Sequence, residues 1–263
     1  MPRPPRRPAV PRARASSPKP ARAATPRHGL ARVLSKLGVA SRTQAAAWIA
    51  QGRVAINGRI VREAESPTDI SRDRIALDGV EVAARERVYI MLNKPRGIVT
   101  TASDERGRDT VYALLEGAGL PWLAPVGRLD KASEGLLLFT NDTQWAAAIT
   151  APQTHLDKTY HVQVDRLPDE ALLAAMITGV DECGERLALK SVRELRRGEK
   201  NAWLEIVLDE GRNRQIRRVL AAFDIGVLRL VRVAIGPLAL GDLAKGAWRT
   251  LDEAEVAGLR CEG

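Results

Sequence analysis

The stretch GRLDKASEGLLLFTND, residues 127–142, places a charged turn directly before an unbroken apolar run. The run from Gly135 to Phe139 is short and continuous, which is typical of a strand buried on both faces. Asp130 therefore stands at the mouth of a buried strand. A carboxylate there, when desolvated and paired with a guanidinium, stays ionised and becomes a directed nucleophile or base. Aspartate is also a favoured turn residue, so a plain turn-capping role fits Asp130 at least as well.

Strands and helices alternate on both sides of this stretch. The expected strands are residues 88–92, 135–139, 159–164, 203–208 and 227–233, and the expected helices are residues 110–116, 143–150, 169–176 and 214–222. Thr250 and Glu253 have the spacing of a capping box for a final helix. Strands outnumber helices and short turns join many of them. We therefore predict an α+β domain over residues 87–257, with helices packed on a mixed, mostly antiparallel sheet.

Residues 29–80 have a different texture and predict a small separate domain of two helices and a hairpin. Apolar residues at positions 30, 33, 34 and 37 form the stripe of a short helix that ends at Gly38. Ser41 and Gln44 then cap a second helix, which stops at Gly52. The pair Asn57-Gly58 between apolar runs is the strongest short signal for a hairpin turn, because both positions need positive φ.

The formal net charge of +9 is unevenly distributed. Residues 1–28 hold eight basic side chains, no acid and eight of the 15 prolines, which predicts a disordered basic arm. Residues 29–80 carry eight bases and five acids, and residues 81–263 are slightly acidic. Attraction to nucleic acid is therefore expected to come mainly from the first 80 residues.

Several classes of protein are disfavoured by the sequence. There is no apolar run of membrane-spanning length and no secretory signal, and the prolines of the arm would break the helix of an organellar transit peptide, so we predict a cytoplasmic protein. Cys183 and Cys261 are isolated, and the three histidines lack metal-ligand spacing. No Walker, dinucleotide or Gly-x-Ser-x-Gly motif is found. We expect no metal and no cofactor.

The run Arg212-Asn213-Arg214-Gln215-Ile216-Arg217-Arg218 begins one of the expected helices. A spacing of four residues is expected to put Arg214 and Arg218 on one face, with Arg217 turned elsewhere. A solvated arginine face is one interpretation. The other is a clamp on RNA phosphates in which one arginine turns inward to a carboxylate.

The first domain resembles the S4 domain, a small RNA-binding module of ribosomal proteins and RNA-modifying enzymes. The matching segments are residues 30–37, Gly38-Val39-Ala40-Ser41-Arg42, Gly52-Arg53-Val54 and Ile56-Asn57-Gly58. On charge alone, its basic residues fit a solvated face as well as a phosphate-binding one. The resemblance favours RNA phosphates as their partners. The contacts it implies are Arg32, Lys36, Arg42 and Arg53.

Residues 88–252 resemble the catalytic domain of ribosomal RNA pseudouridine synthases that carry an N-terminal S4 domain. The motifs, in order, are LNKPRG at 92–97, GRLD at 127–130 with EGLLLFTND at 134–142, KTY at 158–160, EGRNRQIRR at 210–218, and LRL at 228–230 with IGP at 235–237. The chain departs from the usual pattern at Val219, where methionine is common, and at Asp224-Ile225, where a turn with glycine is common.

The resemblance implies that Asp130 is the catalytic aspartate, Tyr160 the active-site tyrosine and Arg217 the arginine that ion-pairs with Asp130. The RNA contacts expected in this domain are Lys94, Arg96, Arg128, Arg212, Arg214, Gln215 and Arg218. The implied enzyme, an isomerase of the intramolecular-transferase class, flips a uridine out of RNA and rejoins its base through C5. Whether Asp130 attacks the ribose or acts as a base stays open.

The motifs look more like those of large-subunit than small-subunit enzymes, so 23S rRNA is the expected substrate and 16S rRNA the alternative. The expected partner is rRNA or a ribosomal assembly intermediate, bound by a monomer. A second alternative is a non-catalytic S4-type RNA-binding assembly factor. The joint presence of Asp130, Tyr160 and Arg217 argues against it, because a carboxylate in a phosphate-facing cleft repels RNA.

Overall fold

The small N-terminal domain in the computed structural model has the helix pair and hairpin that the sequence predicts. The structure describes residues 27–102, 106–182 and 184–260. The elements of this domain are β1 (His28–Gly29), α1 (Leu30–Lys36), α2 (Arg42–Ala50), β2 (Val54–Ile56), β3 (Arg59–Val61), β4 (Pro67–Thr68), β5 (Ile75–Leu77) and β6 (Val80–Glu81). Four strands form a sheet in the order β3-β2-β5-β6, and β1 pairs with β4. The side chain of Ser41 accepts a hydrogen bond from the Gln44 N–H, as expected of an N-cap.

The structure tests the predicted hairpin turn but describes only the last two residues of the predicted arm. Asn57 and Gly58 have φ values of 51° and 81°, which confirms the turn between β2 and β3. The arm was expected over residues 1–28, of which residues 1–26 lie outside the described part. His28, at its end, belongs to β1, where it is paired with Thr68.

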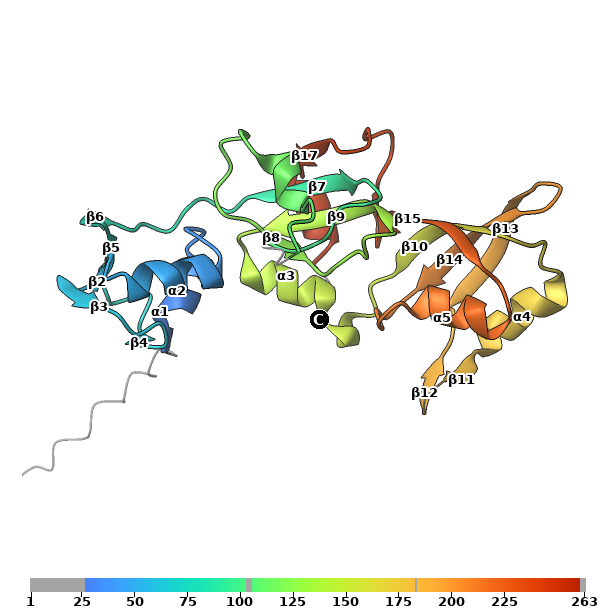
Figure 1. The fold of residues 1–263 in the computed structure, drawn as a ribbon, viewed down its shortest axis with the longest axis horizontal. Coiled ribbons are helices and arrows are strands. Elements are labelled where there is room, and N and C mark those ends of the chain that lie inside the picture. Colours follow the sequence, from blue (N-terminus) through green and yellow to red (C-terminus); the bar gives the residue numbers. More distant parts are fainter. Residues whose placement is uncertain (1–26, 103–105, 183, 261–263) are drawn as a thin grey trace, which may run out of the picture.

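The second domain is built on a large sheet with the order β13-β14-β10-β15-β9-β7-β17 (Figure 1). Its strands are β7 (Tyr89–Lys94), β8 (Ala124–Val126), β9 (Glu134–Thr140), β10 (Lys158–Val164), β13 (Ser191–Arg197), β14 (Ala202–Leu208), β15 (Val227–Ile235), β16 (Leu238–Ala239) and β17 (Trp248–Thr250). Its other elements are η1 (Val111–Leu115), α3 (Thr143–Thr150), η2 (Pro152–Thr154), α4 (Glu170–Thr178), β11 (Val180–Glu182), β12 (Glu185–Leu187), α5 (Gln215–Ala222) and α6 (Glu253–Gly258). β8 pairs with β9 and β16 with β15. All these pairs are antiparallel except β9 with β15, so the predicted mixed, mostly antiparallel sheet is confirmed.

Helices cover different faces of this sheet at its two ends. α4 and α5 lie along one side of β10 and β14, where Val162, Leu204 and Leu220 share a core (Figure 1). Near β7 and β9, residues of α3 and α6 such as Trp145 and Val256 pack in a second core. Every residue of β9 is buried, as the apolar run of the sequence predicts.

Local details of three helices differ from the sequence expectations. The final capping box is formed by Asp252 and Glu255, two residues later than expected. The helix expected over 110–116 is a 3-10 helix over Val111–Leu115. After α5, Asp224 adopts a φ of 56°, so it takes the left-handed conformation for which glycine is otherwise favoured.

The two domains touch through the loop that follows α1. The carbonyl oxygen of Gly38 accepts a hydrogen bond from the Trp122 N–H at 3.2 Å, and that of Leu37 accepts one from Arg85 at 3.4 Å. A side chain at Gly38 would press on the Asn141 amide. Within residues 27–102, 106–182 and 184–260, none of the helices combines the length and apolar character needed to cross a bilayer.

Candidate active site

Asp130 lies on the loop between β8 and β9, and a buried lysine holds that loop from beneath. Lys94, the last residue of β7, is fully buried. Its Nζ donates to the carbonyl oxygens of Pro95 and Asp130 at 3.1 Å and of Ser133 at 2.9 Å. Burial lowers the pKa of Lys94 to about 8, although the nearby carboxylates of Asp130 and Glu134 act to raise it.

The expected RNA contact of Lys94 is therefore wrong. Its side chain has no exposed surface, and its ammonium group is committed to three backbone carbonyls. A cation that binds phosphate has to reach solvent, whereas this one sits where β7 meets the loop. Lys94 instead fixes the backbone of Asp130.

The ion-pair partner of Asp130 is Arg214. The Arg214 Nη1 lies 3.3 Å from the Asp130 Oδ2, and both side chains are partly exposed. Arg214 has φ 51° and ψ 29°, a left-handed conformation that is uncommon for a residue other than glycine. Such conformations persist where the surrounding structure enforces them, often at active sites.

The expected arrangement of Arg214, Arg217 and Arg218 needs correction in two respects. α5 begins at Gln215, so Arg214 stands outside the helix and does not share a face with Arg218. The expected ion pair between Arg217 and Asp130 is also not found among the described residues. Arg217 donates to the carbonyl oxygens of Val227 at 3.4 Å and Ala132 at 3.3 Å.

Arg217 still belongs to the surroundings of Asp130. Its Nε is buried and has no hydrogen-bond partner within the described part of the chain. Burial lowers the pKa of Arg217, the guanidinium groups of Arg214 and Arg96 lower it further, and the Asp130 carboxylate opposes them. The charge of Arg217 thus interacts with those of Asp130, Arg214 and Arg96.

Tyr160 is connected to the strand that follows Asp130 through backbone pairing in the sheet. On β10, Tyr160 is paired with Arg232 of β15, and Arg232 is paired in turn with Gly135 of β9. Gly135 has φ +100°, and a Cβ there would overlap the Arg232 carbonyl oxygen, so only glycine lets β9 and β15 approach so closely. Tyr160 packs on the core beneath α4 and α5, the side of the sheet that carries Arg214.

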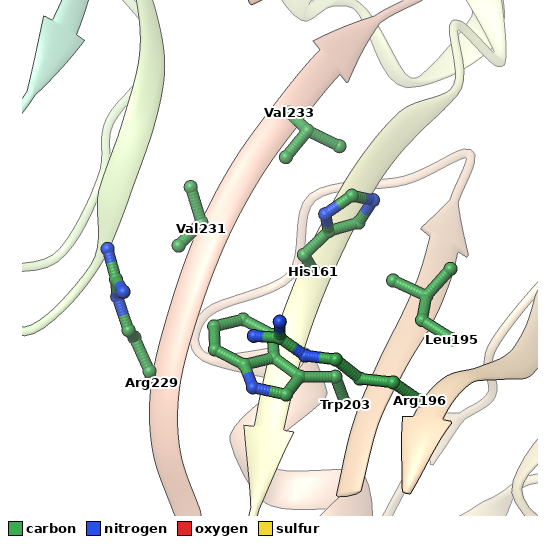
Figure 2. Close-up of a pocket in the computed structure, with 7 residues that line it drawn as sticks. All are labelled: His161, Leu195, Arg196, Trp203, Arg229, Val231 and Val233. Carbon is green, nitrogen blue, oxygen red and sulfur yellow. The ribbon is translucent and has the colours of Figure 1, made fainter. Parts of the chain in front are cut away.

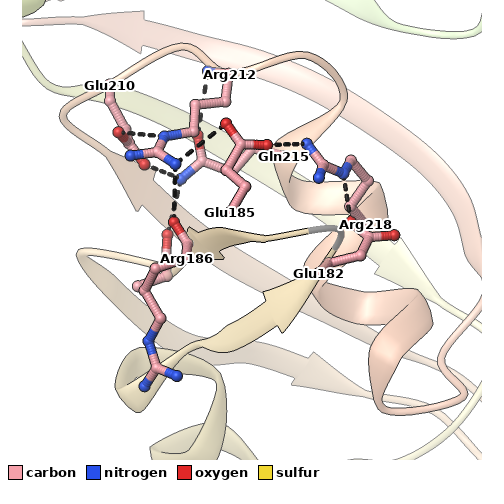
Figure 3. Close-up of polar contacts among 8 residues, drawn as sticks. Glu182, Glu185, Arg186, Glu210, Arg212, Gln215 and Arg218 are labelled. Carbon is pink, nitrogen blue, oxygen red and sulfur yellow. Dashed lines mark hydrogen bonds and ion pairs between the residues drawn. The ribbon is translucent and has the colours of Figure 1, made fainter.

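A charged network holds the beginning of α5 against the β11–β12 hairpin (Figure 3). Glu185 is the central acid: its carboxylate lies 3.1 Å from Arg212 and 2.7 Å from Arg218. Arg218 also pairs with Glu182, and Arg212 pairs with Glu210 at 2.8 Å. The guanidinium of Arg218 keeps the pKa of Glu185 below its usual range. The network fixes both ends of the segment that presents Arg214.

Gln215 belongs to this network as well, so its expected RNA contact is wrong. Gln215 is buried and donates to the Glu210 carboxylate at 2.6 Å and to the Ala188 carbonyl at 2.9 Å. Sequence reasoning did not find the roles of Glu182 and Glu185. They lie about 30 residues before their arginine partners, and no local pattern connects the two segments.

The expected RNA contacts of the S4 domain, together with Arg96 and Arg128, differ in exposure and in whether they already have a partner. Arg32, Arg42, Arg96 and Arg128 are exposed. Arg53 is ion-paired with Asp78 at 2.6 Å. Lys36 contacts the ring of His28 at 2.9 Å, and desolvation lowers the pKa of Lys36. Among the described residues, no three His, Cys, Asp or Glu side chains converge in a way that could hold a metal ion.

Comparison with known proteins identifies the family of both domains. The family model for RNA pseudouridylate synthase matches residues 88–222, and that for the S4 domain matches residues 29–69. An uncharacterized RNA pseudouridine synthase of Aquifex aeolicus is 39% identical over 228 residues, covering 86% of this chain and 91% of the relative. Ribosomal large subunit pseudouridine synthase B of Bacillus subtilis is 35% identical over 234 residues, with coverage of 88% and 95%.

A solved structure shares the fold. The crystal structure of a pseudouridylate synthase superposes with a TM-score of 0.61 at 32% identity, covering 88% of this chain and 99% of that protein. The sequence resemblance is thus confirmed over both domains. The chain belongs to the RNA pseudouridine synthase family and carries an N-terminal S4 domain.

Proposed function

We propose that the chain isomerises one uridine of ribosomal RNA, most simply of the large-subunit 23S rRNA, to pseudouridine. The observation that carries this proposal is the Asp130 carboxylate, ion-paired with Arg214 on a loop that Lys94 anchors. The large-subunit assignment draws on the similarity to two ribosomal large subunit pseudouridine synthases B, from Bacillus subtilis and Pseudomonas aeruginosa, each 35% identical.

In this proposal the target base is extruded from the RNA, at a cost of a few kcal/mol of unstacking, and enters the site beside Tyr160. The bond from ribose C1′ to uracil N1 breaks, the base rotates, and a bond from C1′ to C5 forms. The proton that leaves C5 is balanced by one gained at N1, so no external oxidant or reductant takes part. Arg128, an exposed residue two positions before Asp130, holds the strand that loses the flipped base.

Asp130 acts in this reaction on the ribose or as the base that permits glycosidic cleavage. Either route needs a carboxylate held in a fixed direction, and a guanidinium in contact with it provides that. Arg214 orients Asp130 through their ion pair, and Arg217 supports the loop through the carbonyl of Ala132. Tyr160 stacks on the flipped base and assists removal of the C5 proton.

The decisive experiment compares Asp130→Asn with wild type on ribosomal RNA from cells that lack the protein. Pseudouridines are mapped across both rRNAs, and one site is expected to require the wild-type chain and to stay unmodified with Asp130→Asn. Asp242→Asn, at an exposed loop position, is the matched control and should act like wild type. Modification by Asp130→Asn at the wild-type rate would refute the catalytic role. A dependent site in 16S rRNA would refute only the large-subunit assignment.

The cellular location and the oligomeric state of the enzyme are part of the proposal. We expect a cytoplasmic monomer that binds rRNA or an assembly intermediate through exposed S4 residues such as Arg32 and Arg42. Equilibrium sedimentation of the free protein and fractionation of ribosomal particles test these two points. A stable dimer, or association with mature ribosomes alone, would contradict them.

A further inference from the structure

The second domain has a groove on the face of its sheet that points away from Arg214 and α5. Successive residues of a strand point to opposite faces, so Tyr160 and His161 on β10 separate the two sides. Tyr160 packs on the core under α4 and α5. His161 faces a groove of about 340 Å³ whose other lining residues come from β13, β14 and β15 (Figure 2). They are Leu195, Arg196, Trp203, Arg229, Val231 and Val233.

A β-bulge builds one wall of this groove. Glu194 is paired with Leu204 and Arg196 with Trp203, which leaves Leu195 as the extra residue of β13. Without the bulge, Arg196 would alternate to the face covered by helices. A bulge re-aims side chains in this way. As a result the Arg196 guanidinium lies over the Trp203 ring, 4.9 Å from its centroid, as Figure 2 shows.

The opposite wall carries a second arginine. The Arg229 guanidinium is 5.8 Å from the centroid of the Trp203 ring and forms an ion pair with Glu134 at 2.7 Å. Glu134 begins β9, four residues after Asp130, so the loop that carries Asp130 leads directly into the strand that contacts Arg229.

The charges that face this groove leave an excess of positive charge. Arg193 and Arg229 are each ion-paired, with Glu205 and Glu134 respectively. The His161 ring also lies 3.4 Å from Glu205. Arg196 forms no ion pair with any residue in the described part of the chain. It is therefore the cation available to a ligand.

We propose that this groove binds an unpaired nucleotide of the RNA, with the base stacked against the Trp203–Arg196 pair and a phosphate on Arg196. Aromatic rings and arginine planes are the surfaces on which proteins stack single-stranded bases. The aliphatic side chains of Val231 and Val233 provide an apolar wall for the base. The inference takes RNA as its ligand from the proposed function and adds a second contact site, on the face of the sheet opposite to Tyr160.

The test measures binding of a fluorescein-labelled single-stranded oligouridylate to the full chain carrying Asp130→Asn, so that turnover plays no part. Trp203→Ala and Arg196→Ala are each expected to raise the Kd about tenfold, given the usual worth of one stacked base. Trp203→Phe keeps an aromatic ring and should stay within about twofold. Arg166→Ala, which removes an exposed arginine outside the groove, is the control for loss of charge and should also stay within about twofold.

Photo-crosslinking with an oligouridylate that contains 5-iodouridine locates the contact directly. The expected product is a peptide crosslinked at Trp203. Unchanged affinity of Trp203→Ala and Arg196→Ala, both with the wild-type circular dichroism spectrum, would overturn the proposal. Crosslinks confined to the S4 domain and the Asp130 loop would overturn it as well. If Trp203→Ala fails to fold, Arg196→Ala and the crosslink decide the matter, and neither depends on whether Asp130 is catalytic.

Discussion

The Nζ of Lys94 donates to the carbonyl oxygen of Asp130 at 3.1 Å. A fully buried lysine therefore binds the backbone of the proposed catalytic residue. The carbonyl oxygens of Pro95 and Ser133 accept the other two hydrogen bonds of the same ammonium group. A buried cation is tolerated only when such partners compensate its desolvation. The loop that carries Asp130 is thereby tied to β7, the strand next to β9 in the sheet.

The depressed pKa of Lys94 predicts a specific dependence of stability on pH. The folded chain loses this proton near pH 8, whereas the unfolded chain keeps it up to about pH 10.5. Between these values the unfolded chain binds more protons, so the free energy of unfolding rises with pH. Lys94→Met lacks this contribution. From pH 8 to 10.5 the unfolding free energy of wild type should therefore increase by roughly 3 kcal/mol relative to that of Lys94→Met.

Urea denaturation of both proteins at several pH values checks this prediction. Because other titrating groups are common to the two chains, they cancel in the difference. A difference that stays constant over this range would show that Lys94 titrates normally in the folded protein.

Arg214→Gly separates the side chain of Arg214 from its backbone conformation. Glycine adopts the φ of 51° without strain, so the melting temperature should be unchanged or slightly raised. Loss of the ion pair to Asp130 should lower kcat at least tenfold, by analogy with other preorganised charges in active sites. Single-turnover pseudouridine formation and thermal unfolding measure the two effects. If Arg214→Gly keeps wild-type kcat while Arg217→Lys loses it, Arg217 is the functional partner of Asp130.

Glu185→Gln removes the acid that bridges Arg212 and Arg218. Because both arginines flank Arg214, we expect kcat to fall several-fold while the KM for RNA changes little. The matched control is Asp181→Asn on the same hairpin, which breaks the exposed ion pair to Arg186, and exposed pairs contribute little. Equal kinetics for the two variants would show that Glu185 does not position Arg214 and acts only as a surface charge. Partial rescue by Glu185→Asp would support its role in positioning α5.

Gly135→Ala tests the close approach of β9 and β15. Alanine at this position is strained by a φ of +100° and overlaps the backbone of Arg232. Gly58→Ala is the control, because Gly58 also has positive φ, 81°, but nothing lies within 4 Å of an added Cβ. We expect Gly58→Ala to cost about 1 kcal/mol of unfolding free energy and Gly135→Ala at least about 2 kcal/mol more. Similar losses for both would show that the sheet relaxes around residue 135.

Features set by local chemistry could be predicted from the sequence. The Asn57-Gly58 turn, the Ser41 cap and the buried strand over 135–139 each depend on residues close together in the chain, and the structure confirms all three. The position of Asp130 at the mouth of that strand follows for the same reason. Local patterns fail by one or two residues at helix ends, as with the cap at Asp252 and the start of α5 at Gln215.

By itself the sequence determined the two domains, the order of the motifs and the position of Asp130 before a buried strand, because turn chemistry, periodicity and motif spacing are properties of neighbouring residues. The tertiary structure alone decided the inward direction of Lys94, the choice of Arg214 as partner of Asp130 and the groove around Trp203. Each of these depends on segments brought together from distant parts of the chain. Lysine and arginine side chains are long enough either to extend into solvent or to reach a buried partner. Only the packed fold decides which of these two a given side chain does.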